Sequence, residues 1–266
     1  MNQGRTLFNY SLLSDIPITA YWLLGFVEAE GTFGLRSLSP YFQVAQHSNS
    51  LHVLKAIQLF LGNLNNGFPF SIFSRPPSCS LVINKVTNVY SLTVQDVDSL
   101  YGHVLFFFLG MSFQTRKFVD FKYWALTLYM HKFGFFYTPE GRQLANSISL
   151  FINDGRYSNK PGKVIEAPTE GNIQSVLELP LQVTLTPDMT HLQLSRLFTT
   201  LRGKDGFSVW VYDHGVLVNG SPFPSYSDAH QSIGLPRTSR AIGRSLDTGK
   251  LYLSRYSFYS RKLLSS

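Results

Sequence analysis

The chain has 266 residues and a formal net charge of +7, and 44% of its residues are hydrophobic, a composition that excludes an intrinsically disordered chain. The basic excess favours a polyanionic partner such as nucleic acid, and the single cysteine, Cys79, excludes an internal disulfide framework and a multi-cysteine zinc site. The longest apolar run, residues 104–113, is about half as long as a helix that spans a bilayer, so no membrane partner is expected.

Residues 14–153 predict an α+β domain in which helical and strand patterns alternate. A helix is expected to begin near Asp15, a candidate N-cap, and to run to about Glu30. Two runs with period-2 alternation follow, TFGLRS and YFQVAQH, and the turn-rich link between them indicates a hairpin. The further expected elements are a helix at 50–62, two strand-like runs at 68–74 and 79–95, the second broken by a polar turn at Thr87 and Asn88, and helices at 97–109, 118–132 and 138–153. The order is α-β-β-α-β-β-α followed by two helices.

Residues 154–199 differ in composition from the segment before them. They are polar and rich in glycine, proline and asparagine up to about residue 180, which indicates a linker or a long surface loop. A helix is possible near the end of this stretch, with a cap at Thr186 and Pro187.

Residues 200–266 form a basic C-terminal unit, with nine lysines and arginines against four acids. The pattern predicts a hairpin about His214, a short helix that begins at Ser225 or Ser227, a second helix at 238–249 and a final strand at 252–258. Two short helices joined by a tight glycine-containing turn are typical of a helix-turn-helix. Three arginines spaced i, i+3, i+7 would give the second helix one basic face: Arg237, Arg240 and Arg244. The alternative is a solvated basic face with no ligand.

The stretch LLGFVEAEG, at the end of the first helix, combines small residues with an acid. Gly25 and Ala29 lie four residues apart on one helix face, which lets another helix approach closely. Glu30 ends that helix, where the dipole is negative, so its carboxylate requires a basic neighbour or a metal ion. If a second copy of this helix packed there, two Glu30 carboxylates would meet and a divalent cation such as Mg²⁺ would relieve their repulsion. Such a site activates water for phosphodiester hydrolysis. The alternative is a helix end with two solvated acids.

LLGFVEAEG resembles the signature of the LAGLIDADG homing endonucleases. Gly25, Ala29 and Gly31 match the small positions of that motif, and Glu30 falls on its final acid. The segments PYFQVAQHSNSLHVLKAIQLFLG and TPEGRQLANSI are also similar to that family, so the resemblance covers roughly residues 17–153. It implies a saddle-shaped, curved antiparallel sheet that lies in the major groove of DNA, with two saddles joined by their motif helices.

The resemblance also implies roles for individual residues. Glu30 would bind Mg²⁺, Gln46 would orient a metal-bound water, and Lys117 would stabilise charge on the phosphate. Arg116 could equally supply that charge, and Gln46 could be an ordinary amide at a strand end. Glu28 lies off the face of Gly25 and is interpreted as structural or solvated.

Arg36 and Gln43 are the candidates for base recognition on the sheet. Arg36 would share a face of its strand with Thr32 and Gly34, and Gln43 would share one with Tyr41 and Ala45. Arginine suits guanine and glutamine suits adenine. A one-residue slip in register would exchange the faces.

The C-terminal unit resembles the small modular DNA-binding repeat found in homing endonucleases of organellar introns, which implies that Arg237, Arg240 and Arg244 bind DNA. Only one LLGFVEAEG motif occurs in the chain, so the resemblance implies a homodimer that cuts a near-palindromic double-stranded DNA target and promotes intron mobility. The compartment expected is the mitochondrion. Two alternatives stay open: an intron RNA maturase with the same fold, and a DNA-binding protein that does not cleave.

Overall fold

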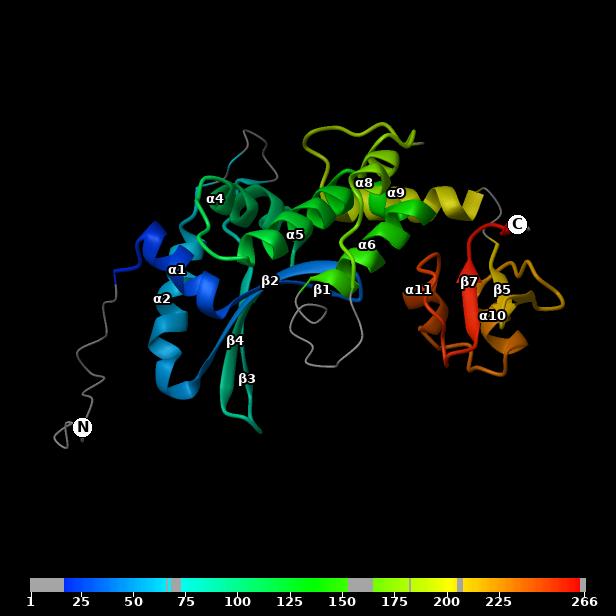
Figure 1. The fold of residues 1–266 in the computed structure, drawn as a ribbon, viewed down its shortest axis with the longest axis horizontal. Helices are drawn as coiled ribbons and strands as arrows, with labels where there is room; N and C mark the ends of the chain where they lie inside the picture. Colours follow the sequence, from blue (N-terminus) through cyan, green and yellow to red (C-terminus); the bar gives the residue numbers. More distant parts are fainter. Residues whose placement is uncertain are drawn as a thin grey trace. The chain divides into compact units, whose positions relative to one another are not determined.

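The computed structural model describes residues 17–65, 67, 73–152, 165–181, 183–204 and 208–263 (Figure 1). Its contacts divide the chain into two compact units, the described parts of Met1–Gly34 with Pro40–Lys122 and those of Leu35–Ser39 with Tyr123–Ser266. Each unit is described by itself. Within the described residues, no helix has both the length and the apolar character needed to cross a membrane.

The first helix, α1 (Ala20–Glu30), begins later than the sequence predicts. Its N-cap is Thr19, whose Oγ1 accepts a hydrogen bond from the Trp22 amide at 3.2 Å, so the prediction of Asp15 as the cap is wrong. Asp15 itself lies outside the described residues. Leu23 and Val27 are fully buried, and α1 passes directly into β1 at Gly31.

A four-stranded antiparallel sheet follows, in the order β1-β2-β4-β3. Its strands are β1 (Gly31–Arg36), β2 (Ser39–His47), β3 (Cys79–Asn84) and β4 (Val89–Val94). Ser37 and Leu38 both have positive φ, as the two-residue turns that match the twist of a hairpin require. The predicted hairpin is therefore confirmed. The predicted strand at 68–74 lies mostly outside the described residues.

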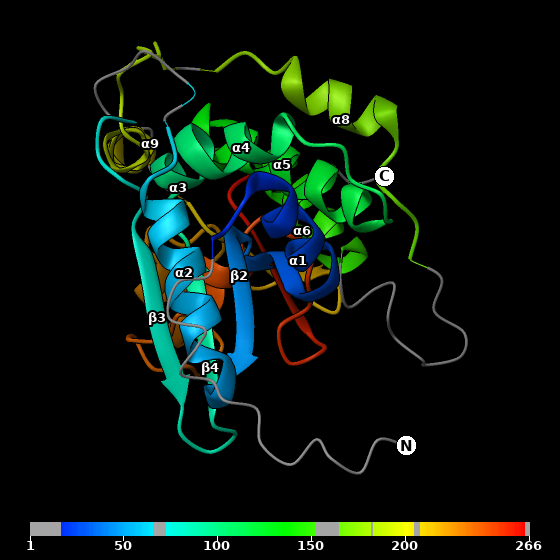
Figure 2. The same ribbon diagram turned by 90° about the vertical axis from the view of Figure 1, so that its left-hand side faces the viewer.

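One face of the sheet is apolar and covered by helices. Phe42 pairs with Val94 and Val44 with Leu92, and all four side chains are buried. Helices α1 and α2 (Leu51–Gly62) lie over the sheet (Figure 2). Phe33 on β1 is also buried, with its ring centroid 5.4 Å from that of Phe42. Core packing thus fixes which side chains of each strand face away from the helices.

The predicted helix at 97–109 is present, with a π-helical centre: α3 (Val97–Ser99), η4 (Leu100–Leu105) and α4 (Phe106–Leu109). After it come α5 (Lys117–Lys132), η5 (Phe135–Tyr137) and α6 (Pro139–Phe151), and a short 3₁₀ turn, η2 (Ser48–Ser50), precedes α2. Thr138 caps α6 as predicted. The α+β fold class and the element order are confirmed.

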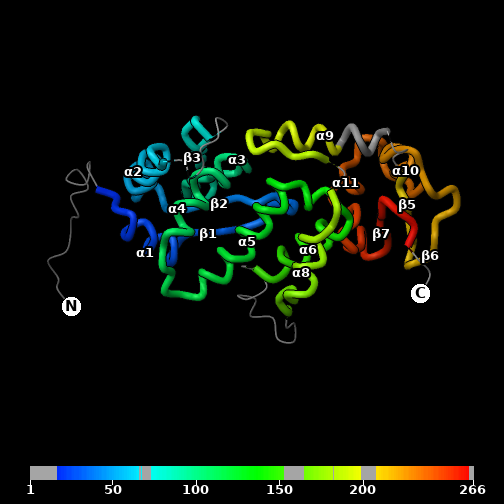
Figure 3. Tube along the Cα trace, turned by 90° about the horizontal axis from the view of Figure 1, so that it is seen from above, coloured from blue at the N-terminus to red at the C-terminus, as the bar shows by residue number. Residues whose placement is uncertain are grey.

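The stretch predicted as a linker contains a helix, α8 (Glu170–Leu177), capped by Thr169. Its one buried side chain, Val176, joins a core cluster with Leu144 and Ile148 of α6, and α8 lies beside α6 (Figure 3). Helix α9 (His191–Lys204) follows. Thr190 and Gln193 cap it reciprocally, so the predicted cap at Thr186 is wrong.

The C-terminal unit has its own core and a three-stranded sheet in the order β6-β5-β7. Its elements are β5 (Trp210–Asp213), β6 (Val216–Leu217), α10 (Tyr226–Ser232), α11 (Ala241–Ser245) and β7 (Tyr256–Tyr259). Ser225, not Ser227, caps α10. The last strand starts late because Leu253 and Ser254 have positive φ and form a turn.

Helix α11 is shorter than the sequence predicts, which corrects one expectation. Arg237 precedes the helix, Arg240 is its N-cap and only Arg244 lies within it. The three arginines therefore do not share one helical face.

Candidate active site and nucleic-acid interface

Helix α1 presents an outer face of small and aromatic residues to solvent: Tyr21, Trp22, Gly25 and Ala29. A Cβ added at Gly25 would meet no atom within 4 Å. Tyr21 is 79% exposed, and the Trp22 ring stacks on Phe26 at 5.0 Å. This outer face has room for a second helix to approach the backbone of α1.

Glu30 and Lys117 both lie at the C-terminal end of α1. The Glu30 side chain is exposed, and no hydrogen bond or ion pair to it occurs among the residues that the structure describes. Lys117, the first residue of α5, donates from Nζ to the carbonyl oxygen of Gly31 at 2.8 Å. A cation here offsets the negative end of the helix dipole. The basic neighbour expected from the motif is therefore Lys117.

Glu28 has a structural role that separates it from Glu30. Its Oε1 accepts hydrogen bonds from the amides of Gln114 and Thr115, both at 2.7 Å. These bonds attach the segment before α5 to α1 and so position Lys117. No local sequence signal predicts them, because the donors are backbone groups far along the chain.

Gln46 lies at the same end of the β1–β2 hairpin as Glu30. Phe33 and Phe42 are neighbours across the hairpin, so counting along both strands sets Gly31 opposite Val44, next to the end of β2. By strand alternation Gln46 shares the face of Phe42 and Val44, the face that α1 covers, and it is half-buried beside its partner Tyr90.

The described part of the chain contains no group of three or more histidine, cysteine, aspartate or glutamate side chains that could hold a metal ion. Glu30 alone offers an exposed carboxylate at this end of α1, a hard oxygen donor of the kind that Mg²⁺ prefers. Among the described residues, this end of α1 therefore offers one exposed carboxylate.

The face of the sheet away from the helices is largely polar and forms cross-strand rows. Gln43 pairs with Thr93 and Thr93 with Ser80, and Thr93 donates to Gln43 Oε1 at 3.4 Å. The next row joins Ala45, Ser91 and Val82.

Arg36 on β1 is exposed, and by strand alternation it points to the opposite face from the buried Phe33, as predicted. Gly34 leaves space for Tyr41, since a Cβ at Gly34 would lie 2.6 Å from the tyrosine ring. The face assignment made for Arg36 and Gln43 therefore agrees with the observed burial.

The C-terminal unit exposes basic side chains around α11: Arg237, Arg240, Arg244 and Lys250. Arg237 donates to Gln231 Oε1 at 2.9 Å. Arg255, in contrast, forms a bidentate pair with Asp213, and this guanidinium lowers the pKa of the Asp213 carboxyl to about 2. Arg255 is therefore neutralised by Asp213 within the C-terminal unit, whereas the basic side chains near α11 face solvent.

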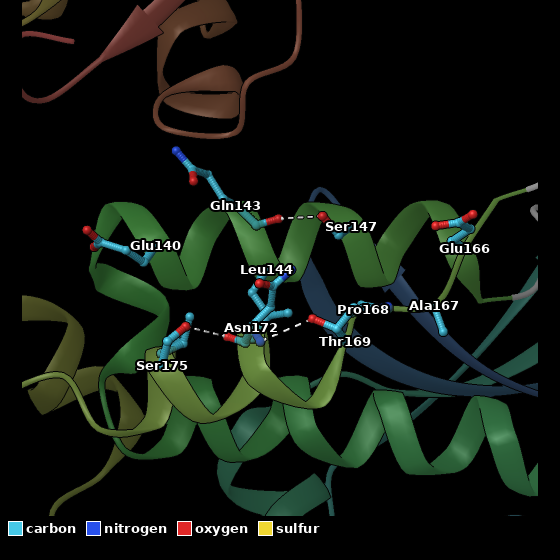
Figure 4. Close-up of a pocket in the computed structure, with 11 residues that line it drawn as sticks. Glu140, Gln143, Leu144, Ser147, Glu166, Ala167, Pro168, Thr169, Asn172 and Ser175 are labelled. Carbon is cyan, nitrogen blue, oxygen red and sulfur yellow. Dashed lines mark hydrogen bonds between the residues drawn. The ribbon is translucent and has the colours of Figure 1, made fainter. Parts of the chain in front are cut away.

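A cavity of about 440 Å³ lies between α6 and α8 (Figure 4). Two of its lining groups bond locally: Ser147 donates to the Gln143 carbonyl, and Thr169 accepts from the Asn172 amide. None of the predicted site residues lines it.

Fold and site together define an α+β domain with one exposed acid at the end of a helix whose outer face is open. The family model described as LAGLIDADG endonuclease matches residues 23–128. The matched segment holds Glu30, Gln46 and Lys117 and is similar to the LAGLIDADG endonuclease family.

A curated relative, the uncharacterized mitochondrial protein RF1 of Saccharomyces cerevisiae, is 30% identical over 59% of this chain. The alignment spans 36% of the length of that relative.

Solved structures also resemble the chain, each at 22% identity. The homing endonuclease I-TnaI matches over 61% of this chain and 98% of its own, with a TM-score of 0.42. Meganuclease I-SmaMI bound to DNA and the LAGLIDADG homing endonuclease I-GzeII in complex with its DNA target each match over 53% of this chain and 46% of their own, with TM-scores of 0.44 and 0.43.

Proposed function

We propose that this protein is a site-specific DNA endonuclease that makes a double-strand break by Mg²⁺-dependent phosphodiester hydrolysis and thereby promotes intron mobility. The observation that carries the proposal is Glu30: an exposed acid that ends the open outer face of α1, with Lys117 bonded to the next residue. The match of residues 23–128 to the family model described as LAGLIDADG endonuclease supports it.

Two copies of the chain act together in this proposal. The outer faces of two α1 helices pack through Gly25 and Ala29, which brings two Glu30 carboxylates close to each other. These carboxylates would hold Mg²⁺, and the bound ion would lower the pKa of a water molecule and offset charge on the phosphate. The proposal includes a homodimer because a second carboxylate is needed, and among the described residues Glu30 is the exposed acid at this end of α1.

Lys117 and Gln46 complete the site. The Lys117 ammonium keeps a fixed position through its bond to the Gly31 carbonyl and stabilises negative charge that develops on the scissile phosphate. Gln46, on the helix-covered face at the end of β2, orients the attacking water through its amide. Arg116, which precedes Lys117, is the alternative source of this charge.

Double-stranded DNA is bound by two surfaces. The polar face of the sheet, with Arg36 and Gln43, reads base edges in the major groove of a near-palindromic target. The exposed arginines of the C-terminal unit, Arg237, Arg240 and Arg244, bind the backbone and adjacent bases, as a modular DNA-binding repeat with two short helices would. We place the protein in mitochondria, in line with its similarity to a yeast mitochondrial protein.

The decisive experiment incubates the purified full chain with a DNA library in Mg²⁺ and sequences the ends produced. We expect cleavage at one site family, abolished by chelation, and a loss of at least about a hundredfold in rate for Glu30→Gln. The control is Asp188→Asn, an exposed acid in a turn before α9, which is expected to cleave normally.

Equal cleavage by Glu30→Gln would contradict the role of Glu30 as the metal ligand. Tight binding of the intron RNA with no cleavage of any DNA would favour the alternative of an intron RNA maturase. Tight binding of DNA without cleavage would favour a regulatory protein.

A further inference from the structure

Helix α6 is bonded to the C-terminal unit through side chains on two of its turns. Arg142 Nη2 donates to the carbonyl oxygen of Gly243 in α11 at 3.0 Å, and Asn146 Nδ2 donates to that of Thr248 at 3.2 Å. An ion pair between Glu140 and Arg261 adds a third contact. Arg142 and Asn146 are 9% and 8% exposed, so these donors lie inside a packed interface within the second unit.

The bonds satisfy carbonyl groups that α11 leaves open. The Asp247 amide, which would close the helix on the Gly243 carbonyl, donates to the Phe258 carbonyl instead at 2.9 Å. The Gly243 oxygen is therefore one of the orphan acceptors of a helix end, and the Arg142 guanidinium supplies its donor. A cation also suits the negative end of a helix dipole.

The hydrogen bonds from Arg142 and Asn146 go to the backbone carbonyls of Gly243 and Thr248 and use no basic side chain near α11. Leu246, Asp247 and Thr248 are buried, whereas Arg240, Arg244 and other basic side chains of this region remain exposed. Arg142 and Asn146 donate to backbone carbonyls of the C-terminal unit, so apart from Arg261, which pairs with Glu140, the contacts leave the exposed arginines near α11 available. Docking on α6 and binding of a polyanion are thus compatible.

We infer that α6 is the docking platform of the C-terminal unit, and that Arg142 and Asn146 are positioning residues that make this unit bind DNA as one body with α6 rather than as a flexibly tethered tail. The DNA part of this inference rests on the proposed function. A docked unit brings its arginines to the target already placed, so binding does not have to restrict a mobile segment.

The first experiment measures docking in the free protein by spin–spin distances between labels on α6 and on α10. Exposed positions Leu150 and Ser232 are replaced by cysteine in a Cys79→Ser background. We expect one narrow distance distribution, which broadens in the double variant R142A/N146A and narrows again in R142K/N146Q, which retains the donors. The control, Q143A/S147A, changes exposed residues of the same helix and is expected to stay narrow.

Two results would overturn the inference. One is a broad distance distribution in the protein that keeps Arg142 and Asn146. The other is a narrow distance distribution in R142A/N146A when its circular dichroism spectrum is unchanged. This measurement needs no DNA, so it is independent of the proposed function.

The second experiment uses a DNA target selected from a random library on the immobilised full chain. Five base pairs, about half a helical turn, are inserted at each successive position between the footprint centre and its outer edge. We expect at least a tenfold loss of affinity for the protein with an intact platform at insertions between the two surfaces, and less than a threefold loss for R142A/N146A. Equal losses would contradict docking on DNA. No DNA binding by either protein, with a narrow spin-label distance, would contradict the proposed function and leave the docking in the free protein intact.

Discussion

At the scale of single residues, two neighbouring acids of one motif have separate tasks. Glu28 is half-buried and accepts two backbone amides of the segment before α5, whereas Glu30 is exposed. The difference follows from helix geometry, because residues two positions apart point in different directions around α1. Glu28 therefore stabilises the fold, and Glu30 is the residue proposed to take part in the chemistry.

Replacing the two acids should separate stability from activity. Glu28→Ala is expected to lower the free energy of unfolding by about 2 kcal/mol, since it leaves two amides without their charged acceptor. Glu28→Gln, which keeps a carbonyl oxygen, should lose less than half of that. Glu30→Ala should leave stability within about 0.5 kcal/mol. Urea denaturation measures all three, and an equal loss for Glu28→Ala and Glu30→Ala would contradict the assignment.

A buried histidine makes the stability of the second unit sensitive to acid. His131 bonds through Nε2 to the Leu38 carbonyl at 3.0 Å and stacks on Phe136. Burial, and to a lesser degree His191 and Arg142, lower its pKa from 6.5 to about 3. Because the folded pKa lies below the unfolded one, the stabilising contribution is complete above pH 6.5 and is lost as the pH falls from 6.5 towards 3.

The expected loss at pH 5 relative to pH 7 is about 2 kcal/mol from His131 alone. Denaturation of the unmodified protein and of His131→Gln at both pH values isolates this contribution, because the lowered pKa values of His103 and His230 act in both proteins. An identical pH dependence in the two proteins would show that His131 does not carry it.

At the scale of elements, α1 combines a buried side with an outer face that the single chain leaves open. Leu23 and Val27 anchor it to the core, while Gly25 has free space around it. A glycine inside a helix is unfavourable for an isolated chain, so its value lies in the approach of another helix. A glycine that lowers helix propensity at an exposed position inside a helix is typical of a helix–helix interface.

Gly25→Leu should therefore raise the free energy of unfolding of the monomer by up to about 1 kcal/mol and prevent association through α1. Light scattering of the free protein and of its DNA complex measures the assembly, and cleavage should be lost with it. The matched control is Gly171→Ala, another helical glycine with no atom near its added Cβ. A Gly25→Leu protein that assembles and cuts normally would contradict the proposed homodimer.

At the scale of the whole molecule, positive charge is concentrated in the last quarter of the chain. The exposed arginines near α11 are not on one helical face but come from its cap and the turn before it. Replacing Arg237, Arg240 and Arg244 by glutamine should weaken DNA binding and lower the slope of log affinity against log salt by about 2 to 3. Titrations at several salt concentrations test this, and an unchanged slope would exclude these arginines from phosphate contact.

Much of the fold was predictable because its signals are local. Period-2 alternation placed β1 and β2, and Thr138 before Pro139 placed α6. Helix α8 was missed because its sequence is polar and its one buried side chain, Val176, gains its partners from α6. The length of α11 was overestimated because the i, i+3, i+7 spacing of three arginines was taken as a sign of helix. Only one of those arginines lies within the helix.

The sequence by itself determined the family motif, the α+β order and the acid at the end of α1, since each depends on residue types at short spacings. Only the tertiary structure decided that Lys117 is the basic neighbour of α1, that Glu28 holds the segment before α5, and that α6 caps α11. These contacts join groups far apart along the chain, and most of their acceptors are backbone carbonyls. Every residue type carries such a carbonyl, so only the folded chain selects which one is used.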